Sequence, residues 1–187
     1  VSVSLGSQSN DIAAGVDDAY EERREGSHDP LDRQGAGDQG LMFCYATDET
    51  DVLMPLPIVT AHRLAAALTE ARTSGVMPYL RPDGKSQVAI GYRDGKVKSV
   101  RGINLVASQS DSAAADLDQL RSDLVTHVVN PVLKSESLKI DNKLISVNPG
   151  GQLIGGGPSL HAGLTGRKTG MDTYGGYCRQ NGSALSG

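Results

Sequence analysis

The chain has 187 residues, 38% of them hydrophobic, and a formal net charge of −4. This length and composition are typical of a globular protein with one ordinary domain or two small ones. The negative charge argues against nucleic-acid binding, which needs a basic face to neutralise phosphates. Apolar runs are too short for a membrane span, and no signal-peptide pattern is visible at the start, so we expect a cytoplasmic protein that contacts no membrane.

The two cysteines, Cys44 and Cys178, belong to no metal-ligand spacing. We expect two free thiols in a reducing cytosol, and one disulfide between them is the alternative. His62 and His127 fall within predicted helices, where a surface or boundary position is a better interpretation than a ligand. No pattern of a nucleophile with its base is present, so the cysteines and histidines indicate no catalytic centre.

The first part of the chain contains few apolar residues. Residues 1–5 alternate serine with apolar residues, which is compatible with the tail of a strand. Residues 6–34 include a dense charge cluster from Asp17 to Arg24 and predict a long mobile loop. A loop of this length inside a compact domain is usually disordered or functional, for example an active-site lid.

Residues 55–74 predict a helix, since Pro55 suits a first turn and Gly75 suits its end. Its apolar residues recur at helical spacing. They are Ile58, Ala61, Leu64, Ala65, Leu68 and Ala71.

Residues 87–93 and 96–108 alternate as strands do, and Asp94-Gly95 between them is a strong hairpin signal. A second helix is predicted at about 113–129 with Pro131 near its end, and a short strand at 143–148. Its apolar stripe is Leu117, Leu120, Leu124 and Val128. This order predicts an α+β fold with helices packed on one face of a mainly antiparallel sheet.

Two of four unusual segments precede or begin the hairpin. GAGDQG at 35–40 allows close backbone approach to a ligand and offers the carboxylate of Asp38, although an exposed turn explains it too. In LRPDGKSQV at 80–88, Pro82 and Gly84 predict a turn at the entrance of a strand. There Asp83 could accept from a ribose or base and Lys85 could pair with phosphate, and a solvated turn explains them equally well.

The other two segments lie near the end of the chain. GLTGRK at 163–168 is not a Walker A loop, because Arg167 stands where a glycine is needed. Its adjacent cations, Arg167 and Lys168, could still clamp a polyphosphate. The glycine-rich stretch YGGYCRQNGSALSG could wrap an anion with backbone N–H groups.

Together these segments resemble S-adenosylmethionine synthetases, also called methionine adenosyltransferases. The matching stretches run in the family's order and at close to its spacing, and the insert DDAYEERREGSHDPLDRQ is similar to actinobacterial members. The stretches are QSNDIAAGVD, PLDRQGAGDQGLMFCYATDETDVLMPLPI, GVMPYLRPDGKSQV, VNPGGQLIGGGP, AGLTGRKTGMDTYGG and ALSG.

The resemblance implies formation of S-adenosylmethionine from ATP and L-methionine, followed by triphosphate hydrolysis. It also implies Mg²⁺ and K⁺ as cofactors and a homodimer or tetramer. It divides the chain into the end of a first domain with the mobile loop (1–34), a central α+β domain (35–146) and the start of a C-terminal segment (147–187). The family's GHPDK segment and the lysine that follows ALSG are not among these residues, so we expect a chain incomplete at both ends. Most of the family's metal ligands would lie in the missing segments, and no residue of this chain is predicted to be a metal ligand.

By the same resemblance, residues of several segments contact the substrates. Lys85, Arg167 and Lys168 would be catalytic, and Gln8 and His161 would bind methionine. The ATP-binding residues would be Asp38, Asp83, Gly84, Lys85, Gln152, Leu153, Arg167, Lys168 and Ala184.

Several positions depart from the family's pattern. His161 replaces an Asp that contacts methionine, so an acceptor for the amino group is lost. Gln152 and Leu153 replace an Arg and a Phe beside the adenine. A non-catalytic relative that binds nucleotide or pairs with a complete subunit is therefore the alternative, and an unrelated anion-binding α+β domain is the third hypothesis.

Overall fold

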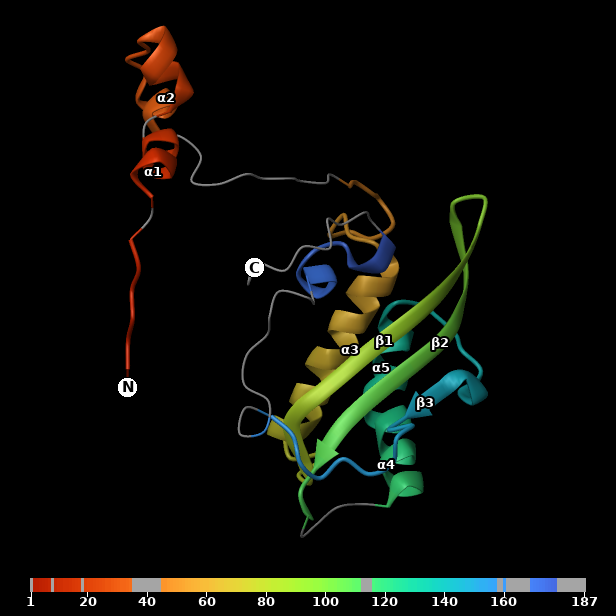
Figure 1. Ribbon diagram of the computed structural model, residues 1–187. Coiled ribbons are helices and arrows are strands. Elements are labelled where there is room, and N and C mark those ends of the chain that lie inside the picture. The colour runs from red at the N-terminus through yellow and green to blue at the C-terminus, as the bar shows by residue number, and fades with distance from the viewer. Residues whose placement is uncertain are drawn as a thin grey trace. The chain divides into compact units, whose positions relative to one another are not determined.

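The structure is a computed structural model that describes residues 2–7, 9–17, 19–34, 45–111, 116–157, 160 and 169–177. The chain forms two compact units, Val1–Met42 and Phe43–Gly187 (Figure 1). Each unit is described by itself.

The first unit contains short helices where the sequence predicted a loop. They are α1 (Asn10–Val16), the π-helical turn η1 (Glu21–Glu25) and α2 (Pro30–Gln34). Local hydrogen bonds account for two of them: the Ala13 N–H donates to the Ser9 carbonyl at 2.9 Å at the start of α1, and Asp29 Oδ1 accepts from the Leu31 N–H at 2.9 Å at the start of α2. Ser2–Ser7 forms no strand, so the predicted strand tail is wrong.

The second unit begins with helix α3 (Leu56–Thr73), close to the predicted bounds. Pro55 is its N-cap residue, and Gly75 follows its end with φ +80°, a left-handed conformation that glycine adopts at low cost. Leu64 and Leu68 are buried as predicted. Ala65 is exposed, because it lies at the edge of the buried stripe.

The sheet has the order β1-β2-β3, with β1 (Leu80–Arg93) antiparallel to β2 (Lys96–Gln109). At the predicted hairpin, Asp94 and Gly95 have φ of +52° and +71°, as a two-residue turn with both central residues left-handed requires. β3 (Ile145–Val147) pairs in parallel with β2 and is shorter than predicted. The residues just before β3 form a 3-10 turn, η4 (Asn142–Leu144), where the sequence predicted the start of the strand.

The second predicted helix is a continuous run of three parts: α4 (Leu117–Leu124), a π-helical turn η3 (Val125–Val129) and α5 (Asn130–Ser135). Pro131 lies in the first turn of α5 instead of ending the helix. A proline is tolerated in the first turn of a helix because the N–H that it lacks is not needed there, and the turn before α5 is the wider π-turn. Residues 113–115 of the predicted helix lie outside the described residues.

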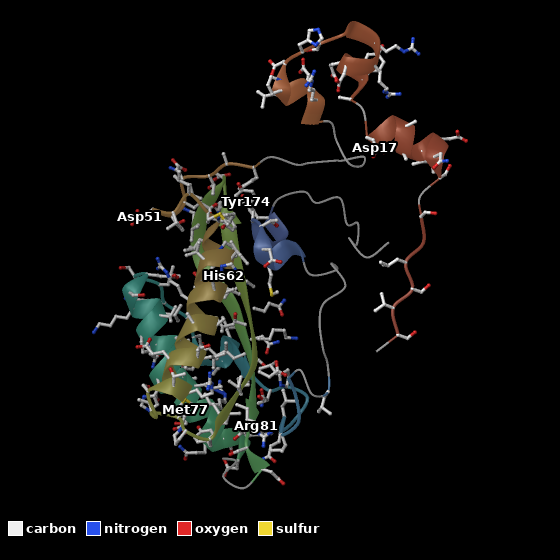
Figure 2. All side chains as sticks on the ribbon, turned by 90° about the vertical axis from the view of Figure 1, so that its left-hand side faces the viewer. Asp17, Asp51, His62, Met77, Arg81 and Tyr174 are labelled. Carbon is white, nitrogen blue, oxygen red and sulfur yellow. The ribbon has the colours of Figure 1, made fainter. Side chains whose placement is uncertain are left out.

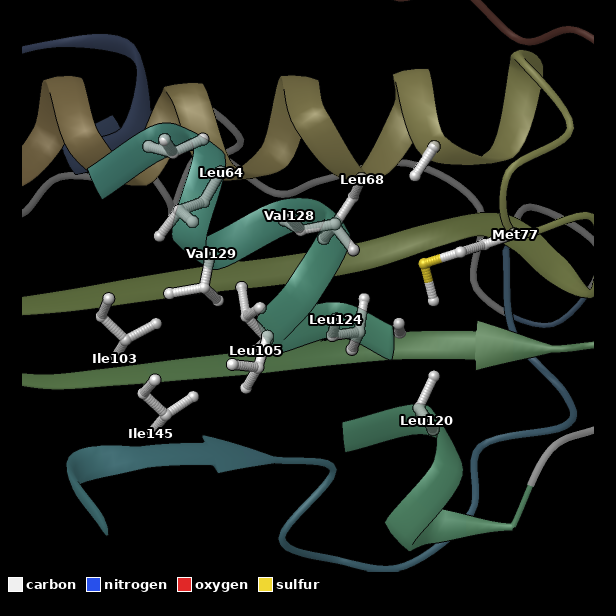
Figure 3. Packing of buried hydrophobic residues seen from close by; sticks show 14 of the residues in the cluster. Leu64, Leu68, Met77, Ile103, Leu105, Leu120, Leu124, Val128, Val129 and Ile145 are labelled. Carbon is white, nitrogen blue, oxygen red and sulfur yellow. The ribbon is translucent and has the colours of Figure 1, made fainter. Parts of the chain in front are cut away.

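The core lies between one face of the sheet and the helices. Leu64 and Leu68 of α3, Leu105 of β2, and Leu124 and Val128 of the second helical run are at most 8% exposed and belong to one cluster (Figure 3). Burying a side chain of this kind is worth about 1.5–3 kcal/mol. Residues 103, 105, 107 and 109 of β2 all face this core. The α+β fold with helices on one face of a mainly antiparallel sheet is confirmed.

Candidate functional site

The start of β1 is an irregular strand instead of the predicted turn. Leu80 pairs with Gln109, but the next pair is Gly84 with Ala107, so β1 has two more residues than β2 over this stretch. Asp83 lies in this bulge. A bulge leaves residues unpaired and changes the direction of their side chains, a common device near functional sites.

Asp83 joins β1 to the glycine-rich segment 150–157. Its Oδ2 accepts a hydrogen bond from the Gly157 N–H at 3.1 Å, and its main-chain carbonyl accepts from Ser108 Oγ at 3.0 Å. Gly156 packs so closely that a Cβ there would lie 2.5 Å from Asp83 Oδ2. Only glycine fits at position 156 while Asp83 keeps this place.

Residues at the end of β2 bind the same part of the chain, at Asn148 and at Leu153. The Asn148 side chain is 4% exposed and exchanges two hydrogen bonds with the main chain of Ala107, at 2.9 and 3.0 Å. One residue beyond Ser108, the Gln109 N–H donates to the Leu153 carbonyl at 2.8 Å. Three predicted site residues, Asp83, Gly84 and Leu153, are therefore brought to one end of the sheet.

The cations of β1 are exposed and carry no hydrogen bond or ion pair to the rest of the described chain. Lys85 pairs with Val106 in the strand register, one position beyond Gly84. Its side chain, like that of Arg81, has no such partner within the described ranges. Arg81 and Lys85 can therefore meet an anionic ligand without first breaking an ion pair. The predicted site residue Gln152 is also exposed, and it has an interaction within the chain.

Asp83, Gly84 and Arg81 line a hollow of about 130 Å³ against Leu68 and Arg72 of α3. This volume is smaller than the roughly 300 Å³ at which small-molecule pockets begin. The hollow by itself is therefore too small to enclose a nucleotide. Among them, no group of three His, Cys, Asp or Glu side chains is placed to hold a metal ion.

A larger hollow, of about 450 Å³, lies between α3, the middle of β1 and the segment with 3-10 turns η5 (Thr169–Asp172) and η6 (Gly175–Tyr177). It contains none of the predicted site residues. Tyr92 and Tyr177 at its rim have ring centroids 5.3 Å apart. The Tyr92 hydroxyl donates to Glu49 at 2.9 Å, and burial followed by this bond raises the pKa of Tyr92 above its ordinary value of 10.0.

The two histidines agree with the sequence-based interpretation. His62 and His127 are exposed, and His62 Nε2 lies 3.0 Å from the Met171 carbonyl. Figure 2 labels His62 on α3. Six predicted site residues lie outside the described part of the chain. They are Gln8, Asp38, His161, Arg167, Lys168 and Ala184. Cys44 and Cys178 lie outside it too.

Sequence reasoning missed Ser108, Gln109, Asn148 and Gly156, which connect the segments of the site. Two signals were available. Gln109 is a polar residue in the core-facing register of an otherwise apolar alternation, and a run of three glycines at 155–157 indicates close backbone approach. Neither signal names the partner, because partners are decided by which segments the fold brings together.

Two family profiles match the chain. Residues 33–153 match the profile described as S-adenosylmethionine synthetase, central domain, and residues 155–187 match that of the C-terminal domain. The chain belongs to the S-adenosylmethionine synthetase family. The family boundary falls between Leu153, which is bonded to β2, and Gly156, which packs on Asp83, so the two parts meet at the candidate site.

Curated relatives named S-adenosylmethionine synthase cover the whole chain. Identity is 52% over 187 residues to that of a Nocardioides species, 56% over 189 to that of a Parafrankia species and 52% over 191 to that of Mycobacterium leprae. The chain spans 47% of the length of each of these relatives. Among the described helices, none has both the length and the apolar character that crossing a membrane requires.

Proposed function

We propose that this chain is part of a methionine adenosyltransferase that forms S-adenosylmethionine from ATP and L-methionine. In this reaction the methionine sulfur attacks C5′ of ATP, the C5′–O bond breaks, and triphosphate leaves and is then hydrolysed. The structural observation that carries the proposal is the Asp83–Gly157 hydrogen bond, which joins two segments of the family's pattern at one end of the sheet. The names of the relatives support the reaction.

The described residues would act by binding and orientation. We infer that Asp83 and the main chain at Leu153 hold the nucleoside part, and that Lys85 approaches the phosphates as a point charge that stabilises the leaving triphosphate. Arg167 and Lys168 would add charge, and Gln8 and His161 would bind methionine. These last four assignments, like those of Asp38, Gln152 and Ala184, rest on the resemblance.

Mg²⁺ and K⁺ are expected from the resemblance alone. Asp83 is the one carboxylate at the described site, and its Oδ2 is already used by the Gly157 N–H. The described residues therefore do not make a metal site. By resemblance, the family's metal ligands lie in segments outside these 187 residues, and we expect the 187 residues alone to bind nucleotide without turnover.

The test is a titration of the chain with the ATP analogue AMP-PNP in the presence of Mg²⁺, followed by an assay for S-adenosylmethionine. Binding without product is expected. Asp83→Asn should weaken binding at least about tenfold, since it removes a charged acceptor. Asp94→Asn at the hairpin tip is the matched control and should bind normally. Failure of the unaltered chain to bind would reject the nucleotide site.

The alternative function is that of a non-catalytic relative that binds nucleotide or pairs with a complete subunit. The replacement of a family Asp by His161 favours it, because an imidazole is a poorer acceptor for the methionine amino group. If the chain is part of a catalytic protein, His161→Asp should raise the affinity for methionine, measured in a titration with L-methionine. An unchanged affinity would remove His161 from the methionine site.

We also propose that the chain associates with a second copy. The face of the sheet opposite the core is not covered by α3, α4 or α5, and exposed Lys85, Gln87 and Ala89 lie along it. A hollow of about 270 Å³ on this face is lined by Gln87, Ala89 and Gly102, among others. The mass in solution, measured by light scattering, should be that of a dimer or tetramer, and a monomer would contradict the proposal.

A further inference from the structure

Gln109, the last residue of β2, has a buried carboxamide without partners. The residue is 0% exposed, and both Oε1 and Nε2 lack a hydrogen-bond partner in the part of the chain that the structure describes. It occupies the core-facing register that Ile103, Leu105 and Ala107 fill with apolar side chains. A buried amide that forms no hydrogen bond is unfavourable, and native proteins seldom retain one without a reason.

The position of Gln109 suggests the reason. Its N–H holds the Leu153 carbonyl at 2.8 Å, and the preceding Ser108 Oγ holds the Asp83 carbonyl at 3.0 Å. Asp83 in turn accepts from Gly157. The two residues at the end of β2 therefore bind both segments that form the candidate nucleotide site, and Gln109 is the one with unused hydrogen-bonding capacity.

We propose that Gln109 is a positioning residue of the nucleotide site, whose carboxamide gains its hydrogen bonds when the nucleotide is bound. This inference rests on the proposed function. The carboxamide offers a donor and an acceptor, which match one peptide group of the adjoining chain. Closure of segment 150–157 on a nucleoside triphosphate brings such a group within reach, so that relief of the unsatisfied amide adds to nucleotide affinity.

The proposal separates the effect on stability from the effect on binding. Gln109→Met keeps the length of the side chain but removes its donor and acceptor, and Gln109→Leu does so with a different shape. Both variants should be at least as stable as the unaltered chain in urea without ligand, since an unpaired buried amide is lost. Both should bind AMP-PNP with Mg²⁺ about tenfold more weakly or worse.

Tyrosine emission can report binding, because the chain has six tyrosines and no tryptophan. Gln119→Met is the matched control. Gln119 is exposed on α4, and among the described residues its side chain bonds to Asp123 alone, so its replacement should change neither affinity nor urea stability measurably.

Normal affinity in both Gln109 variants would overturn the proposal and leave Gln109 a purely structural residue. A parallel loss of stability in the ligand-free variants would overturn it too, because the amide would then have partners without nucleotide. If the unaltered chain does not bind AMP-PNP, the proposed function fails and the role of Gln109 fails with it. Only binding by the unaltered chain, with weaker binding by stable variants, supports the inference.

Discussion

Gly156 shows how one residue without a side chain holds the candidate site together. Its main chain is pressed against the Asp83 carboxylate, and the next residue, Gly157, has φ +77° and donates to the same carboxylate. The first contact requires the absence of a Cβ, and the second requires a left-handed backbone. Glycine is therefore required at these two adjacent positions for different physical reasons.

The first prediction concerns Gly156→Ala. The new methyl group would displace Asp83, because it would lie 2.5 Å from Oδ2, and would break the hydrogen bond to Gly157. We expect a loss of about 0.5–1.5 kcal/mol in the free energy of unfolding, since the bond is exposed, and weaker AMP-PNP binding. Urea unfolding and the binding titration measure both effects.

Gly150→Ala is the matched control in the same segment. A Cβ at Gly150 would meet nothing within 4 Å, and the residue has no positive φ. It should change stability by no more than about 0.5 kcal/mol. Equal losses in the two variants would contradict the role given to the Asp83 contact.

At the scale of elements, α3 is joined to the end of α5 by a buried carboxylate. The Glu136 side chain is 3% exposed, and its two oxygens accept from Thr60 Oγ1 at 2.5 Å and from Arg63 Nη1 at 2.9 Å. Thr60 is fully buried. This contact holds α3 and α5 together beside the apolar core.

The second prediction concerns Glu136→Ala, which leaves the buried Thr60 hydroxyl without its partner. We expect a loss of about 2–3 kcal/mol in the free energy of unfolding, from the lost hydrogen bonds and the unpaired group. Glu70→Ala, at an exposed position of α3, should change it by less than about 0.5 kcal/mol. Similar losses for both variants in urea unfolding would show that Glu136 contributes no more than a surface charge.

At the scale of the whole molecule, tyrosines tie distant segments to Asp and Glu side chains. The Tyr79 hydroxyl donates to Asp123 of α4 at 2.6 Å, and that of Tyr92 donates to Glu49. Burial, followed by these hydrogen bonds, raises the pKa of both hydroxyls above 10.0. The folded state therefore keeps protons that the unfolded chain releases at alkaline pH.

The third prediction follows from this difference. A raised folded-state pKa gives stability that is fully present below the unfolded value of 10.0 and is lost as pH rises through the folded value. The free energy of unfolding should begin to fall as pH passes about 10 and should keep falling at higher pH. Tyr79→Phe should reduce the slope, and Tyr20→Phe, at an exposed position of the first unit, should not. Equal slopes in all three proteins would contradict the assignment.

Much of the fold could be predicted from the sequence because its signals are local. The helical spacing of apolar residues predicted α3, and Asp94-Gly95 predicted the hairpin of β1 and β2. The failures have local causes as well: the helix continues from the π-turn η3 through Pro131, and main-chain hydrogen bonds, with Asp29 at the start of α2, form short helices in a charge-rich segment that was expected to be a loop. The start of β1 was interpreted as a turn because a bulge and a turn use the same residues, Pro82 and Gly84.

The sequence by itself determined the family, the fold class and the residue types available for binding phosphate, because each of these depends on which residues follow one another. Only the tertiary structure decided that Asp83 meets Gly157, that Ser108 and Gln109 hold the two segments, and that the Gln109 amide has no partner among the described residues. Residues 83, 109 and 157 are far apart along the chain. They become neighbours because the packed core fixes the register of β2 against β1, and this register sets what lies at the end of the sheet.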